Sequence, residues 1–306
     1  MEEILSFIND QLDEWKFARD NYDALKNIRT REVKIDNTTY KIQYNPARIV
    51  SSAAKVDPKS LQTRKCFLCS ENRPKEQKSI SFKNRYEILV NPFPIFPQHL
   101  TIPDKNHTPQ RIIDRFRDMV DLAEYLPAFT VFYNGPKCGA SAPDHAHFQA
   151  GIKGFLPIEI EWKKQRRLLI TINNASLWEL DSFPCASIVI EATQKNIAEQ
   201  LFRYFYQSME NKEDEPMMNI LVWKELHKWI IIIFPRKTHR PSCYFAEGND
   251  NILISPASVD LGGVFITPLE KDFNKITAED IKQILEEVCL SRKEMTTLEQ
   301  RLINRI

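Results

Sequence analysis

The sequence predicts an α+β protein built from two similar halves, each an antiparallel sheet with helices packed on it, the second half being degenerate. Three observations favour this class. Short apolar strand patterns alternate with helical patterns along the chain. No low-complexity linker interrupts the chain, and part of the first half recurs in the second. We place the boundary so that residues 1–165 form the N-terminal half, which holds the active site, and residues 166–306 the C-terminal half.

The internal repeat is the most specific of the three. Residues 88–90 (Ile-Leu-Val) recur as residues 220–222, and the Pro-x-Lys-x-His-x-Pro pattern of residues 103–109 recurs as residues 235–241. Both pairs are separated by 132 residues, which indicates a duplicated unit. The same alignment matches residues 144–148 with residues 260–264 over a shorter interval. We therefore expect the second copy to lack the long helix and the polar site of the first.

Individual elements follow from periodicity and capping residues. Helices are expected over residues 3–27, 108–126, 194–209 and 277–290. Thr108-Pro109 and Thr277 to Asp280 are typical helix starts. Strands are expected over residues 86–90, 99–102, 129–133, 219–223, 229–234, 251–254 and 263–267, with a hairpin over 31–44 and a loop over 45–65.

Composition limits the class of function. The net charge is +1 and there is no basic tail, so nucleic acid is not an expected partner. The N-terminus lacks the pattern of a signal peptide, and the longest apolar run, Trp229 to Phe234, is too short to span a membrane. Six cysteines in 306 residues do not indicate a disulfide framework. We expect a cytoplasmic enzyme or binding protein of unknown oligomeric state.

Residues 134–151 are the most informative stretch. A turn of small residues leads into His145-x-His147-x-Gln149. Side chains alternate faces along a strand, so these three polar side chains are expected to share one face. Nitrogen-rich side chains grouped in this way are typical of phosphate chemistry or metal binding.

His147 is the candidate nucleophile, because a neutral imidazole can attack phosphorus and form a covalent intermediate. Gly139, Ala140 and Ser141 are small enough for a phosphate to approach the backbone N–H groups of the turn. Two other interpretations remain open: a histidine pair that only binds a metal, and a pair that packs with satisfied hydrogen bonds.

Cys66-x-x-Cys69 has the spacing of half a zinc site, and His107 and His145 are available to complete a Cys2His2 set. A redox pair and two buried thiols are the alternatives. His239 repeats the position of His107 without a preceding Cys-x-x-Cys, so a histidine at this position can have another use.

The proline-rich segment 91–97 is expected to be a rigid loop. With Phe93 and Phe96, it either forms a wall of a base or ribose pocket or covers the core. Lys137, Arg236 and Lys237 are weaker candidates for phosphate contacts.

These motifs resemble the two-domain branch of the histidine-triad superfamily, which contains galactose-1-phosphate uridylyltransferase, diadenosine tetraphosphate phosphorylase and the GDP-hexose phosphorylases. The resemblance is specific over about residues 66 to 151. It implies that His147 becomes nucleotidylated with Gln149 beside it. It also implies nucleotide or phosphate binding by Asn91, Phe93, Asn134, Gly139, Ala140 and Ser141, and a structural zinc ion on Cys66, Cys69, His107 and His145.

The resemblance implies a nucleotidyltransferase or phosphorylase acting on a nucleotide sugar or dinucleoside polyphosphate, with phosphate or a sugar phosphate as acceptor. Three alternatives are a hydrolase that uses the same intermediate, a nucleotide-binding protein without turnover, and an enzyme with a catalytic metal on His145 and His147. The sequence does not indicate the base or the sugar.

Overall fold

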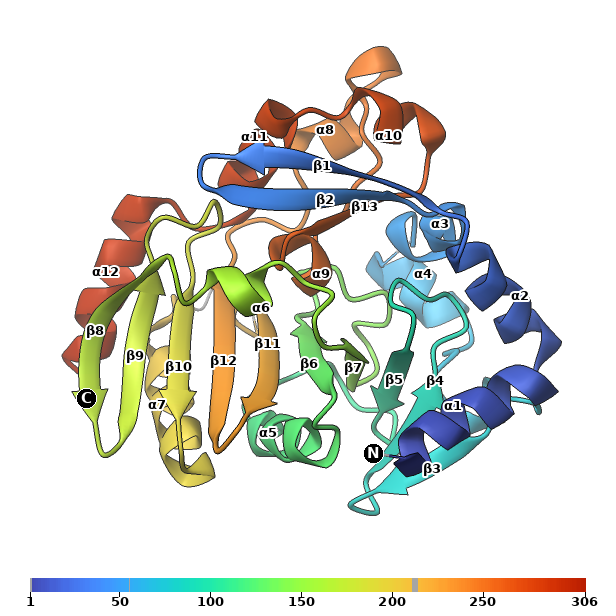
Figure 1. Cartoon of the computed structure of the whole chain (residues 1–306), viewed down its shortest axis with the longest axis horizontal. Coiled ribbons are helices and arrows are strands. Elements are labelled where there is room, and N and C mark those ends of the chain that lie inside the picture. The colour runs from blue at the N-terminus through green and yellow to red at the C-terminus, as the bar shows by residue number, and fades with distance from the viewer. Residues whose placement is uncertain (1, 55, 211–213) are drawn as a thin grey trace.

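A single ten-stranded sheet runs through both halves of the molecule (Figure 1). The computed structural model describes residues 2–54, 56–210 and 214–306. The strand order is β3-β4-β5-β7-β6-β11-β12-β10-β9-β8, and all neighbours are antiparallel. The strands are β3 (Ser79–Phe82), β4 (Tyr86–Val90), β5 (His99–Pro103), β6 (Phe129–Asn134), β7 (His147–Ile152), β8 (Arg166–Ile172), β9 (Ala175–Leu180), β10 (Ile188–Ala192), β11 (Met218–Glu225) and β12 (Lys228–Pro235).

The two halves of this sheet have the same topology. The first half places its strands in the order β3-β4-β5-β7-β6, with a helix between β5 and β6. The second half uses β8-β9-β10-β12-β11, with a helix between β10 and β11. The halves meet where β6 pairs with β11. The predicted α+β class, with two antiparallel, helix-covered halves, is confirmed.

The repeat identified in the sequence does not follow this topology. Residues 88–90 lie in β4, whose counterpart by order and pairing is β9, whereas residues 220–222 lie in β11. Both segments are fully buried strands, and burial alone favours the same aliphatic residues in each. The predicted match of residues 144–148 with residues 260–264 is therefore wrong.

The second half is degenerate for a different reason than the sequence indicated. Its helix is present, but β11 and β12 are joined by a two-residue turn, Leu226-His227. Residues 135–146 occupy the equivalent connection between β6 and β7. On the face of β12 equivalent to the one that carries His147, the residues are Ile230, Ile232 and Phe234, all of them buried in an apolar core.

A three-stranded sheet lies across one end of the structure in Figure 1. It consists of the predicted hairpin, β1 (Arg29–Ile35) and β2 (Thr38–Tyr44), and of β13 (Val264–Thr267), which runs parallel to β2. A strand from residues 263–267 was predicted, but it pairs with the N-terminal hairpin and not with the large sheet. Chain segments more than 200 residues apart are thus joined beside the cleft described below.

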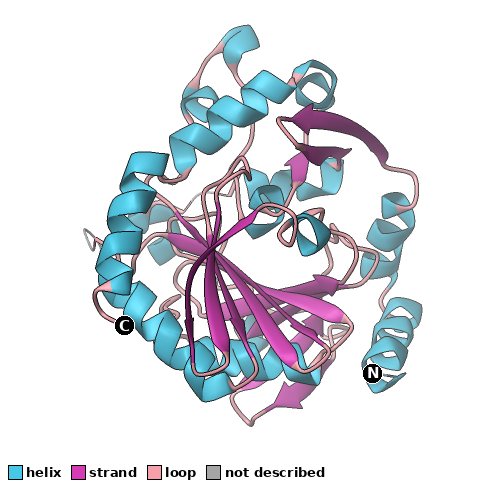
Figure 2. Cartoon of the chain, turned by 60° about the vertical axis from the view of Figure 1, so that its left-hand side comes forward, coloured by secondary structure: helices cyan, strands magenta, loops and turns pink. Residues whose placement is uncertain are grey.

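Helices cover the large sheet on one face (Figure 2). That face packs its apolar side chains against α5 (Phe116–Tyr125), α7 (Lys195–Ser208) and α12 (Arg292–Ile303). The other face of the second half packs against the small sheet and against α9 (Ser258–Leu261) and α11 (Ala278–Val288). The remaining helices are α1 (Glu2–Glu14), α2 (Lys16–Leu25), α3 (Ile49–Ser52), α4 (Pro58–Thr63), α6 (Ile158–Glu161), α8 (Ser242–Phe245) and α10 (Glu270–Lys275), with 3-10 turns at 46–48, 70–72 and 248–250.

Several element predictions need correction. The expected helix 3–27 is interrupted at Trp15, which has extended backbone angles. The expected loop 45–65 contains short helices, and residues 251–254 form no strand. The expected helix 108–126 begins only at Phe116, because residues 108–115 are held by bonds outside any helix. The capping box at Thr277 and Asp280 is confirmed.

Two expectations about the chain as a whole can be compared with the structure. Among the described residues, no helix is both long enough and apolar enough to cross a bilayer. The six cysteines did not indicate a disulfide framework, and Cys185 and Cys289 form one disulfide between segments 104 residues apart. The division of the chain after residue 165 stays a prediction.

Candidate active site and metal-binding group

The side chain of Gln110 bridges β6 and β7 at the point where these two strands diverge. Its Nε2 donates to the backbone oxygens of Asn134 (3.0 Å) and His147 (2.9 Å), and its Oε1 accepts from the backbone N–H of His147 (2.8 Å). These atoms lie at the end of β6 and the start of β7. The side chain thus supplies the ladder bonds that the strands cannot make to each other, and residues 135–146 are free to form a loop. Sequence reasoning missed this role because Gln110 lay in a predicted helix.

The ring of His147 is buried and has one defined tautomer. Its Nδ1 lies 2.8 Å from the backbone oxygen of His145. A carbonyl oxygen can only accept, so Nδ1 carries the proton and Nε2 keeps its lone pair. Burial lowers the pKa of His147 to about 4, and the ring is therefore neutral near pH 7. Nε2 is the nitrogen left for the cleft that His147 lines.

Gln149 is oriented by a second buried histidine. His99 accepts at Nδ1 from the backbone N–H of Ile95 (3.2 Å), so its Nε2 carries the proton and donates to Oε1 of Gln149 (3.0 Å). Burial, together with the nearby charge of Arg48, lowers the pKa of His99 to about 3. Since Oε1 of Gln149 is used as an acceptor, its amide N–H groups remain for the cleft. Neither His99 nor its bond to Gln149 was predicted.

A cleft with two connected lobes lies over these residues. The first, which we call the apolar lobe, has a volume of about 640 Å³. Its lining includes Trp15, Phe17, Phe67, Pro92, Phe93, Asn91, His147 and Gln149. The second, which we call the basic lobe, has a volume of about 60 Å³ and is lined by Arg48, His239, Arg240, Ser255 and the turn Gly139 to Ser141, among others. Arg48, Ala54, Ser141 and Gln149 line both lobes.

The structure brings the predicted nucleotide- and phosphate-binding residues to this cleft. Asn91 and Phe93 lie in the apolar lobe, Asn134, Gly139 and Ala140 in the basic lobe, and Ser141 between them. Asn91 donates to Oγ1 of Thr101 (2.9 Å) and accepts from the backbone N–H of Phe93 (2.9 Å). The proline-rich loop is thereby fixed with the Phe93 ring toward the lobe. The role of these residues in binding a nucleotide or phosphate stays a prediction.

Asn134 and Gly139 also join the two halves. The side-chain oxygen of Asn134 accepts from Nδ2 of Asn219 (2.8 Å) and from Oγ and N–H of Ser258 (2.7 and 2.9 Å). Gly139 has a φ of +88°, and a Cβ there would lie 2.6 Å from the Cβ of Ala257. Any larger residue would push the turn away from the second half.

Four other candidates lie outside both lobes: Phe96, from the predicted pocket wall, and the weaker phosphate candidates Lys137, Arg236 and Lys237. Phe96 is fully buried against Phe132 and Phe155 and lines neither lobe. Arg236 is buried, and its guanidinium donates to Asn219 and to backbone oxygens, so it serves the fold. Lys237 is exposed and lines neither lobe.

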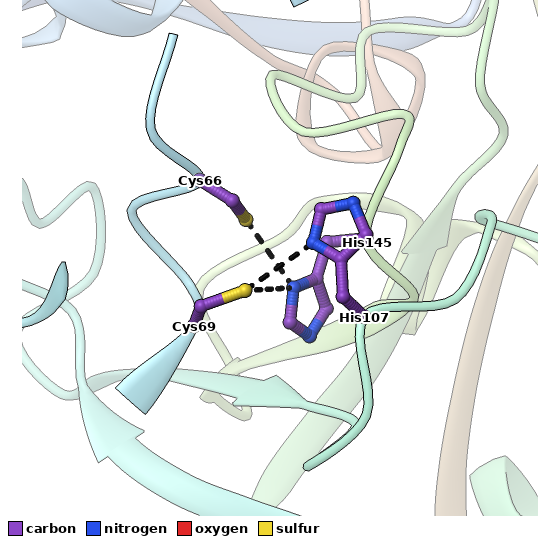
Figure 3. Close-up of side chains that lie close together, drawn as sticks. All are labelled: Cys66, Cys69, His107 and His145. Atoms are coloured by element: carbon purple, nitrogen blue, oxygen red, sulfur yellow. Dashed lines mark hydrogen bonds between the residues drawn. The ribbon is translucent and has the colours of Figure 1, made fainter. Parts of the chain in front are cut away.

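Cys66, Cys69, His107 and His145 gather into one group that could hold a metal ion (Figure 3). Their ligand atoms all lie within 4.8 Å of one another. Sγ of Cys66 is 3.2 Å from Nδ1 of His145, and Sγ of Cys69 is 3.2 Å from Nδ1 of His107. A tetrahedral zinc ion with ordinary bond lengths separates a sulfur and a nitrogen ligand by about 3.5 Å. The donor set and its spacing therefore fit zinc.

The ring of His145 is directed into this group by its other nitrogen. Nε2 of His145 donates to the backbone oxygen of Asp104 (2.7 Å), which leaves Nδ1 toward the two cysteines. His145 precedes β7, so the prediction that it shares a strand face with His147 and Gln149 is wrong. His147 is not a member of the group. This separation weighs against the alternative in which both histidines hold one catalytic ion.

Two family models match this chain, one in each half. Residues 7–152 match the family model described as Domain of unknown function (DUF4922), and residues 159–306 match the model described as GDPGP1-like, C-terminal domain. No curated protein sequence matches the chain significantly.

Among solved structures, the chain is similar to the crystal structure of yeast Ap4A phosphorylase Apa2, with a TM-score of 0.60 and 17% identity over 90% of this chain and 96% of that one. The structures of the same yeast enzyme with AMP and with Ap4A match with TM-scores of 0.56 and 0.54, again at 17% identity. They cover 91% and 90% of this chain and 96% of each of those chains.

Proposed function

We propose that this chain is a nucleotidyltransferase or phosphorylase of the two-domain branch of the histidine-triad superfamily, because residues 159–306 match the model described as GDPGP1-like, C-terminal domain, and the fold is similar to that of yeast Ap4A phosphorylase Apa2. Its substrate would be a nucleotide sugar or a dinucleoside polyphosphate, and the reaction would pass through a covalent nucleotidyl-histidine at His147. The yeast phosphorylase with the same fold has been solved with AMP and with Ap4A, which supports a nucleotide substrate for this chain.

The observation that carries the proposal is the single free nitrogen of His147. Its proton is committed to the backbone of His145, and its pKa lies well below neutrality. A ring in this state needs no base to become a nucleophile. The ring lines a cleft large enough for a nucleoside beside a turn of small residues.

The chemistry of both steps follows from these positions. Nε2 of His147 attacks the α-phosphorus, the N–P bond forms, and the P–O bond to the leaving group breaks with its electron pair on oxygen. The amide of Gln149 donates to a non-bridging oxygen as charge develops there. An acceptor oxygen then attacks the same phosphorus, and the P–N pair returns to Nε2. The acceptor would be phosphate in a phosphorylase and a sugar phosphate in a transferase.

The zinc ion would have a structural role. It would cross-link the loop around Cys66 to the start of β7. Its ligands would be Cys66, Cys69, His107 and His145. The backbone oxygen of His145, which sets the tautomer of His147, belongs to a residue of this set. The metal would therefore stabilise the geometry of the nucleophile without contacting it.

The test offers the protein a panel of α-labelled nucleotide sugars and dinucleoside polyphosphates. We expect an acid-labile, alkali-stable protein label that disappears in His147→Asn and persists in His227→Asn, a matched change at an exposed histidine in the β11–β12 turn. Product analysis with and without phosphate separates a phosphorylase from a hydrolase. Well-folded protein that binds nucleotide equally with and without His147, and takes up no label, would instead be a non-catalytic binding protein.

A further inference from the structure

The basic lobe differs from the apolar lobe in size and in the origin of its residues. Its volume of about 60 Å³ suits a small anion, whereas the 640 Å³ of the apolar lobe suits a nucleoside. Arg48 comes from the first half of the chain, and His239 and Arg240 come from the second. The second half has lost its own site but supplies a cationic side chain, Arg240, and a histidine to the site of the first.

The two arginines are held in place rather than solvated. Arg240 donates from Nε to Oγ of Ser255 (3.2 Å) and from Nη2 to the backbone oxygen of Ala54 (3.1 Å), and its guanidinium lies 4.1 Å from the centre of the Tyr244 ring. Arg48 donates from Nη1 to the backbone oxygen of Phe93 (2.9 Å). Each arginine has five N–H groups, so both retain donors for a ligand. Side chains fixed in this way bind an anion with little loss of conformational freedom.

One acidic side chain, Asp260, lines this lobe and its charge acts on Arg48, but among the described residues it forms no ion pair with either arginine. Its two carboxylate oxygens accept from the backbone N–H groups of Ala257 (2.9 Å) and Ile266 (3.0 Å). Burial, together with the positive charges of Arg240, Arg236 and Lys137, lowers the pKa of His239 to about 4, so this ring is neutral near pH 7. Two arginines, Arg48 and Arg240, against the one carboxylate of Asp260 leave the lining of the lobe net positive, which favours an anion.

We propose that the basic lobe is the subsite for the phosphate of the leaving group and, after it departs, for the phosphate of the acceptor. This inference rests on the proposed function. In an in-line displacement the leaving oxygen departs on the side of phosphorus opposite to His147, and the acceptor oxygen returns from that same side. Ser141 and Gln149 line both lobes, so a phosphorus atom beside them has the nucleoside on one side and the basic lobe on the other.

The subsite gives a use to the Pro-x-Lys-x-His-x-Pro segment of the second half, which takes no part in the metal group. His107 belongs to the metal group, whereas His239 lies at the wall of the cleft, half-buried, with Arg240 beside it. A ligand that carries only one phosphate would occupy the apolar lobe and the site of attack, and would leave the basic lobe empty.

The decisive experiment separates the two half-reactions. Protein labelled at His147 is isolated and mixed with increasing inorganic phosphate, and the rate of label discharge is recorded. In Arg240→Gln we expect the label to form and the phosphate concentration for half-maximal discharge to rise about tenfold, the effect of one lost charge-assisted bond. Arg240→Lys keeps the charge but loses the planar guanidinium with its paired donors. Its phosphate concentration for half-maximal discharge should therefore lie between those of the wild type and Arg240→Gln. Arg203→Gln, at an exposed arginine that pairs with Glu199, should behave as the wild type.

Arg240 also bonds Ala54 and Ser255, so its variants are compared for melting temperature. If Arg240→Gln is not folded, His239→Leu is used, because it removes the ring N–H at the wall of the lobe and the described residues make no hydrogen bond to that ring. The expected result is again a higher phosphate requirement. An unchanged phosphate dependence in a folded variant overturns the subsite and leaves the proposed function intact.

If the wild type takes up no label, the proposed function fails, and the lobe is then tested directly. Titration calorimetry with inorganic pyrophosphate should show binding to the wild type and to Arg203→Gln, and at least about tenfold weaker binding to Arg240→Gln. No binding to the wild type, or equal binding to the three proteins, would overturn the assignment of an anion subsite.

Discussion

His99 donates a hydrogen bond from Nε2 to Oε1 of Gln149 across 3.0 Å. The direction of this bond is fixed, because the other ring nitrogen of His99 accepts from the backbone of Ile95. Gln149 therefore turns its N–H groups toward the cleft, where a phosphoryl oxygen would need a donor. A histidine without contact to the ligand thus determines which end of the glutamine amide the substrate meets.

The first prediction concerns this orientation. In His99→Asn the amide oxygen can still accept from the backbone of Ile95, as Nδ1 does, but the side chain is too short to reach Gln149. In His99→Gln the longer side chain can donate to Gln149 in place of Nε2. We expect kcat to fall about tenfold in His99→Asn with KM nearly unchanged, because a misoriented donor affects the transition state more than binding. His99→Gln should recover most of the activity. Equal kcat values for the two variants would show that the bond does not orient Gln149.

The second prediction concerns stability at low pH. The pKa of His99 is about 3 in the folded protein and about 6.5 for an ordinary histidine. Between these values the unfolded chain binds the extra proton, so the contribution of His99 to stability is present above pH 6.5 and is lost as pH falls toward 3. The free energy of unfolding of the wild type should fall relative to that of His99→Gln, by up to about 1.4 kcal/mol per pH unit. Urea unfolding of both proteins between pH 4 and 7 measures the difference between their free energies of unfolding. The contributions of titrating groups that both proteins share cancel in this difference. Parallel curves would contradict the neutral state of His99.

The third prediction concerns the metal group. We expect the purified protein to contain about one zinc ion per chain, and Cys69→Ser to contain little. Cys243→Ser is the matched control, since Cys243 is a free cysteine outside the group. A chelator should lower the melting temperature of the wild type and of the control but not that of Cys69→Ser, because a ligand at a thousandfold its Kd stabilises a fold by about 4 kcal/mol. Added zinc should restore the wild type. A chelator with no effect on melting, in protein without metal, would show that the group is four free side chains.

The fourth prediction concerns the buried Arg236. Its guanidinium bonds Asn219, Val288, Pro256, Thr238 and His239 across the second half. Lysine keeps the charge but cannot make this set of bonds, so Arg236→Lys should lower the free energy of unfolding by about 2–4 kcal/mol. Lys237→Ala, at the exposed neighbour, should change it by less than about 0.5 kcal/mol. Chemical denaturation measures both, and similar values for the two variants would contradict the structural role of Arg236.

Residues whose function depends on local spacing were predictable from the sequence. Cys66 and Cys69 are close because two residues separate them, and His147 and Gln149 share a face because strand side chains alternate. His107 and His145 were assigned to the cysteines through the resemblance, and the structure brings all four together. Gln110 and His99 were missed, because a polar side chain that supports another from a distant segment leaves no periodic pattern.

Long-range pairing explains the larger errors. Residues 220–222 resemble residues 88–90 because both are buried strands, yet β11 is the counterpart of β6 and not of β4. Residues 264–267 were correctly expected to be a strand, but their partner is β2, more than 200 residues away. A strand pattern specifies which face is apolar and says nothing about which neighbour will pair with it.

The sequence by itself determined the α+β class, the polar strand face of His147 and Gln149, and the metal-ligand spacing, because each depends on residues a few positions apart. Only the tertiary structure decided the tautomer of His147, the orientation of Gln149 and the union of Arg48 with His239 and Arg240 around one cleft. These depend on the direction of hydrogen bonds and on the packing of two halves, both of which arise from contacts between segments far apart in the chain.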